Sequence, residues 1–261
     1  IYEEAVSLVN KGVKELVLIS QDTTRYGTDL GNTNIVKLLK RIETIPNLEF
    51  VRCLYLYPSD VTDELIECIK DSKVIVPYFD IPVQHASDKM LKLMNRRDTN
   101  EGLYKLVERI RKAIPNAVIR TTVMVGFPYE EESDFEILKK FVKDIRFDRL
   151  GGFTYSREED TKGYDMPQVN KNTAKRRLNE IMHIQETISL DKGLERVGEI
   201  HKAIVEEFEG YYYIARSFAF APDDVDGYLF IESDTKLKVG EVVNVKITDA
   251  DSYNLFGKKL D

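Results

Sequence analysis

Hydrophobic and polar positions follow two different patterns along the chain, and the change between them falls near residue 190. Before that point, short apolar runs rich in β-branched residues alternate with segments such as 35–42, whose apolar residues have helical spacing. The runs predicted as strands are 15–20, 50–56, 74–83, 118–125 and 150–155. Because strands that are apolar on both faces alternate with helices, the pattern predicts parallel βα units with right-handed crossovers.

The number of predicted strands limits the choice of α/β fold. Five strands are too few for a closed eight-stranded barrel, so an open, partial parallel barrel or a doubly wound sheet fits better. The chain starts at Ile1 rather than Met, and we expect an internal start with a further strand ahead of it. We expect this α/β unit to cover 1–190, with a linker helix at about 172–190.

After residue 190 the pattern becomes one of short alternating strands separated by turns. The run 241–247 alternates between apolar and polar residues, and glycine or proline punctuates the segments between such runs. We therefore predict that 191–261 forms a small all-β antiparallel barrel.

One stretch, 117–135, combines a predicted strand, a turn and a helix start. The strand ends at Gly126-Phe127-Pro128, and the acidic residues that follow suit the first turn of a helix. The loop after a parallel strand is where α/β folds bind ligands, and Gly126 would let the backbone approach a ligand closely. The alternative is an ordinary βα turn.

Polar residues also end two other predicted strands, Gln21-Asp22 and Gln84-His85. In a parallel barrel these ends and the Gly126 loop meet at one face, where they would suit a small polar cofactor with an amine, a carboxylate and a ribose. His85 alone is weak evidence, because a lone histidine more often makes a structural hydrogen bond than binds a ligand. Arg96 is a candidate for binding a carboxylate in a bidentate manner, the alternative being a solvated helix residue.

The composition of the chain argues against nucleic-acid binding, membrane contact and metal ligation. With 261 residues, 43% of them apolar, the chain is long enough for a sizeable core, and its net charge of −7 gives no overall basic footprint for nucleic acid. No apolar run approaches membrane length, so we expect no membrane contact. Cys53 and Cys68 lack metal-ligand spacing and are expected to be buried thiols in a reduced, cytoplasmic setting. We predict no metal ligands in this chain.

Several motifs, in order, resemble those of the radical S-adenosylmethionine (SAM) methylthiotransferases. The resemblance covers nearly the whole chain and rests on 19–27, 82–87 with 94–99, 120–128 with 131–135, 153–156 and 238–245. The last of these is similar to the family's TRAM domain. The resemblance implies a partial, TIM-like parallel radical SAM barrel followed by the TRAM barrel.

The resemblance also implies cofactors and their binding residues. They are SAM and, in the full-length protein, two 4Fe-4S clusters. The residues implied for SAM are Gln21 and Asp22 toward the methionyl amine, Gln84 and His85 toward the ribose, Arg96, and Thr121, Gly126, Phe127 and Tyr155 on the strands that flank the adenine. The family's CxxxCxxC motif would precede Ile1, and Cys53 and Cys68 match neither cluster. No catalytic residue is therefore assigned, and this stretch alone is expected to fold but to be inactive.

The Gln84-His85 pair resembles the branch of the family that modifies an aspartate in protein twelve of the small ribosomal subunit, whereas the tRNA branch typically has Gln-Ser. Residues 192–261 carry nine Lys and Arg against fourteen Asp and Glu, which favours a basic protein partner over tRNA. The acidic residues singled out are Glu206, Glu207, Glu209, Asp223, Asp224 and Asp226. They are equally compatible with a solvated face. A tRNA adenosine methylthiotransferase and a cluster-free binding module are the alternative functions.

Overall fold

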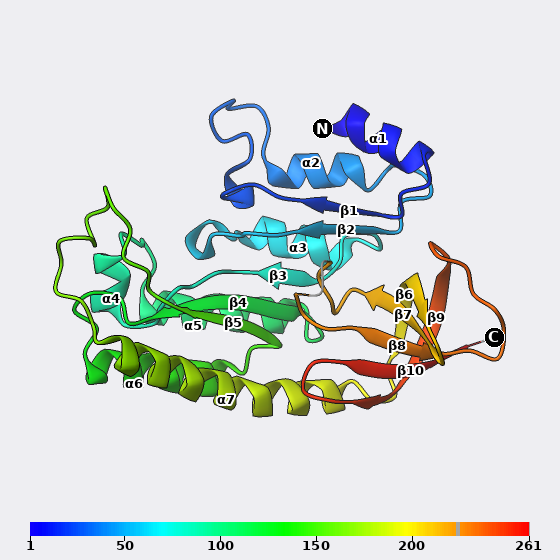
Figure 1. Ribbon diagram of the computed structural model, residues 1–261. Helices are drawn as coiled ribbons and strands as arrows, with labels where there is room; N and C mark the ends of the chain where they lie inside the picture. The colour runs from blue at the N-terminus through cyan, green and yellow to red at the C-terminus, as the bar shows by residue number, and fades with distance from the viewer. Residues whose placement is uncertain (223–224, 261) are drawn as a thin grey trace.

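The computed structural model describes residues 1–222 and 225–260. Its first part is a parallel sheet in which the strands lie side by side in chain order (Figure 1). The strands are β1 (Glu15–Leu18), β2 (Phe50–Cys53), β3 (Tyr78–Asp80), β4 (Val118–Val125) and β5 (Arg149–Thr154). A parallel bridge between Val51 and Ile75 and a hydrogen bond from Leu56 N to Asp80 O (2.8 Å) join β1–β2 to β3–β4–β5. The predicted open parallel barrel is thus confirmed.

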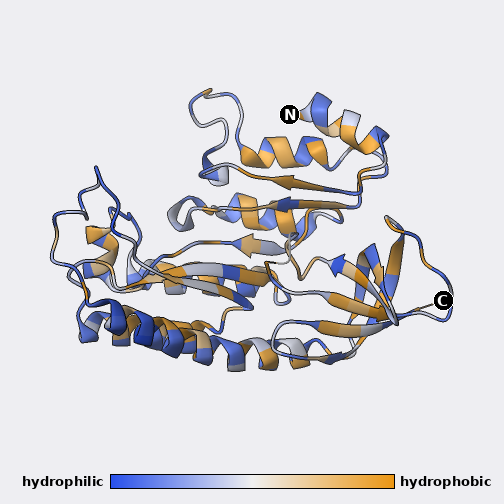
Figure 2. Cartoon of the chain, viewed as in Figure 1, coloured by the Kyte–Doolittle hydropathy of each residue, from blue (hydrophilic) through white to orange (hydrophobic). Residues whose placement is uncertain are grey.

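Helices connect these strands and cover one face of the sheet. They are α1 (Tyr2–Asn10), α2 (Ile35–Ile42), α3 (Asp63–Asp71), α4 (Asp88–Leu93), α5 (Asn100–Ala113), α6 (Glu132–Ile145) and α7 (Lys171–Glu195), with short 3₁₀ turns η1 (Thr23–Arg25) and η2 (Pro58–Asp60). Asn34, Thr62 and Thr99 cap α2, α3 and α5 through their side chains. Figure 2 shows α7 as mostly hydrophilic, and its buried residues include the polar Arg177 and Gln185. Helix α7 therefore packs on the sheet partly through hydrogen bonds.

The C-terminal barrel consists of β6 (Ile200–Glu209), β7 (Tyr212–Ser217), β8 (Leu229–Glu232), β9 (Val242–Ala250) and β10 (Leu255–Lys259). These strands close in the order β10-β8-β7-β6-β9. The pairing is antiparallel except between β8 and β10, which run parallel. The expectation of a fully antiparallel barrel is corrected at this pair, because strand directions cannot alternate all the way around a closed ring of five.

The C-terminal barrel packs against the end of the sheet where β1 to β5 begin, while α4 and the long loops lie at the opposite end (Figure 1). The fully buried Arg52 of β2 joins the two parts, since it pairs with Glu15 (2.9 Å) and donates to the carbonyl oxygens of Ser217 and Phe218 (3.1 and 3.0 Å). One apolar cluster combines residues of both parts, such as Phe50 and Phe220. No helix in the described part of the chain is both long and apolar enough to cross a membrane.

Asp226, predicted to belong to an exposed acidic surface, is instead buried at this junction. Its carboxylate accepts a hydrogen bond from the Tyr78 hydroxyl (2.5 Å) and one from Ala221 N (2.8 Å), and it lies 3.4 Å from Arg120 Nε. A carboxylate with these partners stabilises the junction and is unavailable to a partner. Asp223 and Asp224 lie outside the described residues.

Candidate active site

A cavity of about 360 Å³ opens on the face of the sheet that the helices leave uncovered. We call it the strand-end cavity. Among the residues that line it are Gln21, Tyr57, Gln84, Arg96, Arg120 and Thr122. Its volume lies within the range of small-molecule sites. Three predicted residues are therefore brought together, Gln21 and Gln84 from two strand ends and Arg96 from the segment after α4.

Gln84 shows two signs of functional constraint. Its φ angle of 68° lies in the left-handed region, which costs free energy for a residue other than glycine. Its backbone is held in this state by hydrogen bonds to β4, from Gln84 N to Thr122 O (2.9 Å) and from Met124 N to Gln84 O (2.7 Å). The side-chain Oε1 is buried and has no hydrogen-bond partner among the described residues. A buried acceptor without a partner is rare, and the residue that carries it is one of those that line the strand-end cavity.

Arg96 lies beyond the end of α4 and is clamped rather than solvated. Its Nη2 donates to Pro82 O (2.6 Å), its Nε lies 3.6 Å from Asp98 Oδ2, and its guanidinium stacks 4.4 Å from the centre of the Tyr57 ring. Nε has no hydrogen-bond partner in the described part of the chain. Burial raises the pKa of the neighbouring Asp98 carboxyl. The alternative of a solvated helix residue is therefore wrong, and a cation is held at the cavity wall.

The side chains of Thr121 and His85 point away from the strand-end cavity. The Thr121 hydroxyl donates to Ile81 O (2.8 Å) and is fully buried, while the next residue, Thr122, lines the cavity. Successive strand residues face opposite sides of a sheet, so the prediction was one position off. His85 is also fully buried. Its Nδ1 accepts from Ser87 N (2.9 Å), which leaves Nε2 to donate to Glu130 (3.3 Å). The structural reading of His85 fits this geometry.

Gly126 has a packing role that its sequence context did not reveal. Its φ is 76°, its N–H donates to the Glu130 carboxylate, and a Cβ placed on it would lie 2.5 Å from the Cβ of Ala174 in α7. The glycine thus makes room for a helix, and the close approach of its backbone to a ligand stays a prediction. Glu130 in turn pairs with Arg177 of α7 (3.0 Å), so the loop and the helix are fixed together.

The remaining predicted residues lie near the cavity but do not line it. Asp22 caps η1, and its carboxylate accepts from the Thr24 hydroxyl. The rings of Phe127 and Tyr155 meet edge to face with centres 5.0 Å apart, and the Tyr155 hydroxyl has no hydrogen-bond partner among the residues described. A role for these three residues in cofactor binding stays a prediction.

Sequence reasoning missed six residues that line the cavity: Tyr55, Leu56, Tyr57, Pro82, Arg120 and Thr122. Arg120 Nη1 donates to the buried Asp80 (2.8 Å), whose other oxygen accepts from Tyr55 N (3.0 Å). The sequence of β4 does not separate the two faces here, because Arg120, Thr121 and Thr122 are consecutive polar residues.

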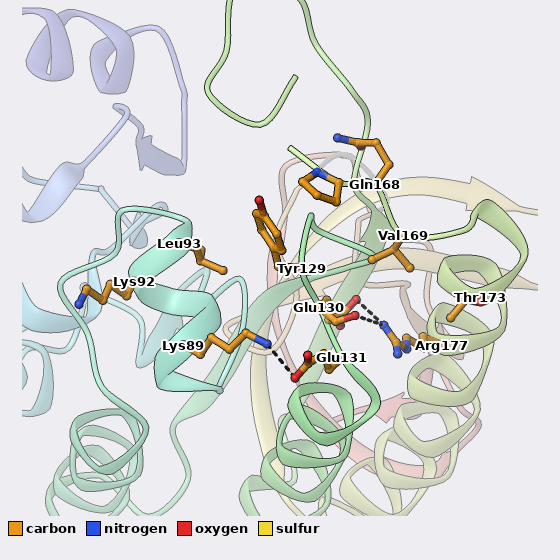
Figure 3. Close-up of a pocket in the computed structure, with 11 residues that line it drawn as sticks. Lys89, Lys92, Leu93, Tyr129, Glu130, Glu131, Gln168, Val169, Thr173 and Arg177 are labelled. Carbon is orange, nitrogen blue, oxygen red and sulfur yellow. Dashed lines mark hydrogen bonds and ion pairs between the residues drawn. The ribbon is translucent and has the colours of Figure 1, made fainter. Parts of the chain in front are cut away.

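A larger groove of about 1040 Å³ lies between α4, the loop after β4 and the start of α7 (Figure 3). Its charged residues are largely paired with one another. Lys89 contacts Glu131 (3.1 Å), and the buried Glu130 contacts Arg177. Tyr129 adds an exposed ring on a left-handed backbone with φ of 64°. Arg177 Nε in this groove also lacks a hydrogen-bond partner among the described residues. The strand-end cavity is the better candidate for a polar cofactor because it brings together Gln21, Gln84 and Arg96.

The two cysteines do not fit an iron–sulfur cluster. Cys53 and Cys68 are both buried in the core between sheet and helices. Burial raises the pKa of the Cys53 thiol from 9.0 to about 12, whereas cluster ligation needs the thiolate. No group of three potential metal ligands occurs among residues 1–222 and 225–260.

Comparisons with known proteins agree with this geometry. The Radical SAM superfamily model matches residues 1–142, and the TRAM domain model matches residues 197–259. Two curated relatives are named ribosomal protein uS12 methylthiotransferase RimO. The one from Acetivibrio thermocellus is 45% identical over 100% of this chain and 58% of its own length. The one from Thermoanaerobacter sp. strain X514 is 49% identical over 99% of this chain and 59% of its own length. The chain thus spans little more than half the length of these relatives.

Among solved structures, methylornithine synthase (PylB) superposes with a TM-score of 0.51 at 8% identity, over 72% of this chain and 52% of that one. At this identity the likeness concerns the fold alone. The open parallel sheet, the superfamily match over residues 1–142 and the C-terminal TRAM match lead to one conclusion: the chain belongs to the radical SAM superfamily and is similar to the RimO methylthiotransferases.

Proposed function

We propose that this chain is part of a radical SAM methylthiotransferase that adds a methylthio group to the β-carbon of an aspartate in ribosomal protein uS12. The observation that carries the proposal is the strand-end cavity, in which Gln84 and Arg96 keep polar atoms unpaired inside a radical SAM sheet. The names of the relatives support the reaction and the protein substrate. The chain would act in the cytoplasm, where ribosomes are found.

The residues of the strand-end cavity fit the functional groups of SAM. The Gln21 amide and the Gln84 Oε1 would accept from its amine and ribose hydroxyls, and Arg96 would bind its carboxylate. Phe127 and Tyr155 would flank the adenine. When bound, SAM supplies the methyl group and the radical source for this chemistry. The chain's own residues would position it and shield the site from water.

Cys53 and Cys68 do not fit the clusters that the superfamily implies, so no step is assigned through them. We propose that residues 1–190 hold the cofactor and residues 191–261 meet the partner. The exposed glutamates Glu206, Glu207 and Glu209 lie on β6 of the C-terminal barrel, although Glu206 is also paired with Arg216 (2.8 Å). An acidic surface there would speed association with a basic protein.

Binding of purified uS12 and of tRNA to the 261-residue chain, measured at several salt concentrations, tests the proposal. We expect uS12 to bind and tRNA to bind weakly, because the C-terminal barrel lacks the clustered positive charge that phosphate contacts need. Tight tRNA binding that weakens steeply with salt, without uS12 binding, would instead favour a tRNA-modifying enzyme.

A further inference from the structure

A second cavity, of about 320 Å³, opens beside the outer strand β5, where α7 and the C-terminal barrel meet the sheet. We call it the edge cleft. The residues that matter here are Arg120, Arg149, Gly151, Val225, Asp226 and Tyr253. Arg120 also lines the strand-end cavity, so the two cavities meet at its guanidinium group.

Arg149 is a half-buried cation without a carboxylate partner. It is paired in register with Arg120 on the neighbouring strand, so both side chains leave the same face of the sheet. Its Nη1 donates to Tyr253 O (3.0 Å), and its guanidinium lies 4.7 Å from the centre of the Phe220 ring. In the described part of the chain no carboxylate lies within ion-pair distance of it, although charges removed from water are normally paired. Several N–H donors of Arg149 are therefore available to an anion.

Arg120 is positioned by both parts of the molecule. Asp80 of β3 holds its Nη1 at 2.8 Å, and Asp226 of the C-terminal barrel lies 3.4 Å from its Nε. Asp226 is itself fixed by the Tyr78 hydroxyl and by Ala221 N. Two arginines thus face two aspartates in a cluster of no net charge, and its unused donors belong to the arginines. The half-exposed Glu186 of α7 also lines the cleft and adds one negative charge to its wall. Such a cluster can accept one further carboxylate.

The two glycines of β5 have different explanations. A Cβ on Gly152 would lie 2.7 Å from Leu178 Cδ1, so packing against α7 requires that glycine. A Cβ on Gly151 would meet nothing closer than Thr122 Oγ1 at 4.0 Å. The fold does not need a glycine at Gly151, and its missing side chain leaves open space in the edge cleft.

We propose that the edge cleft admits the polypeptide segment that carries the residue to be modified, and that Arg149 and Arg120 bind the carboxylate of that aspartate. This inference rests on the proposed function. Val225, Asp226 and Tyr253 of the C-terminal barrel form one wall of the cleft, so a protein docked on that barrel lies next to the entrance. The open space at Gly151 accommodates the aspartate side chain, and Arg120 lies where the cleft meets the strand-end cavity.

The test uses peptides that tile uS12, each made with its aspartates and again with asparagine in their place. Binding to the 261-residue chain is followed by fluorescence anisotropy. One peptide should bind, and its asparagine form should bind about tenfold more weakly, as expected for loss of hydrogen bonds to a charged group. Arg149→Gln should reduce this tenfold difference, because only one of the two guanidinium groups, that of Arg120, remains to distinguish the two forms.

Gly151→Val should weaken binding of the aspartate peptide about tenfold, because the valine side chain fills the cleft. The affinity for SAM should stay unchanged. Gly151→Ser serves in its place if the valine variant unfolds at a lower temperature than the wild type. Arg41→Gln, which removes an exposed arginine of α2 far from the cleft, is the matched control and should bind like the wild type.

Discrimination between aspartate and asparagine that is undiminished in Arg149→Gln would overturn the inference, as would unchanged peptide binding by the Gly151 variants. If Arg149→Gln weakens the binding of SAM but not of the peptide, the carboxylate that Arg149 binds belongs to the cofactor. This result would also overturn the inference. In these cases the proposed function survives. If neither intact uS12 nor any of its peptides binds the wild type, the proposed function fails and the inference fails with it.

Discussion

At the scale of single residues, Gln84 combines a strained backbone with an unpartnered side-chain acceptor. Such strain persists only where the surrounding structure imposes it, and here two hydrogen bonds to β4 do so. An apolar core would gain nothing from this arrangement. It places an amide side chain with an unpaired acceptor at the wall of the strand-end cavity, which suits a cofactor with hydroxyl or ammonium donors.

Replacing Gln84 with glycine distinguishes the effect of its backbone strain from the effect of its side-chain amide. Gln84→Gly should keep the free energy of unfolding within about 1 kcal/mol of the wild type, because relief of strain offsets the added freedom of the unfolded chain. Affinity for SAM should fall, since the amide is gone. Urea unfolding and titration calorimetry check the two effects. Asn47→Gly, at a left-handed position with φ of 66° outside the cavity, is the control. Equal SAM affinity in both variants would remove Gln84 from the site.

At the scale of elements, the loop after β4 and the start of α7 depend on each other. Gly126 lets α7 approach through Ala174, and Glu130 accepts from Gly126 N while it pairs with Arg177. The loop beside the proposed cofactor site is therefore held by a helix that also leads to the C-terminal barrel. A substitution in either element should therefore destabilise the other.

Gly126→Ala tests this dependence. It should lower the free energy of unfolding by about 3 kcal/mol, because it adds a clash with Ala174 to the cost of a left-handed alanine. Gly31→Ala is the matched control. Its φ of 71° is similar but a Cβ there has no neighbour within 4 Å, so it should cost only about 1 kcal/mol. Ala174→Gly combined with Gly126→Ala should recover the difference. Equal losses in the two single variants would show that packing against α7 is unimportant. Urea unfolding of the wild type and of the three variants measures these free energies.

At the scale of the whole molecule, the sheet and the C-terminal barrel share a polar and an apolar junction. Arg52 and Arg120 reach from the sheet to Ser217, Phe218 and Asp226 of the C-terminal barrel. The strand-end cavity is thus built partly by the C-terminal barrel, because Asp226 helps to orient Arg120 at the cavity wall. The two parts are expected to unfold together.

Arg52→Met should uncouple them. The change removes the buried guanidinium from Glu15 and from two carbonyl oxygens, so the free energy of unfolding should fall by about 3–5 kcal/mol. Calorimetry should then show two transitions in place of one. Arg176→Met, which removes an arginine from an exposed pair with Glu180, should cost less than about 1 kcal/mol and leave one transition. A single unshifted transition in Arg52→Met would contradict the role of this junction.

The sequence by itself determined the order and type of the elements. Apolar strand runs that alternate with segments of helical spacing predict parallel βα units, so the parallel sheet followed from local pattern. The meeting of Gln21 and Gln84 followed as well, because parallel strands end at one edge. The change to alternating short strands marked the C-terminal barrel for the same local reason.

Tertiary structure decided which side chains of those elements face the cavity. Thr122 rather than Thr121 lines it because the helices bury the other face of β4, and sequence alternation cannot say which face is covered. Gly126 and Asp226 were assigned to a ligand and to a surface, yet each serves a contact with a segment distant in the chain, Ala174 in one case and Tyr78 in the other. Such contacts depend on how α7 and the C-terminal barrel dock, and docking is set by packing between whole elements rather than by the residues on either side.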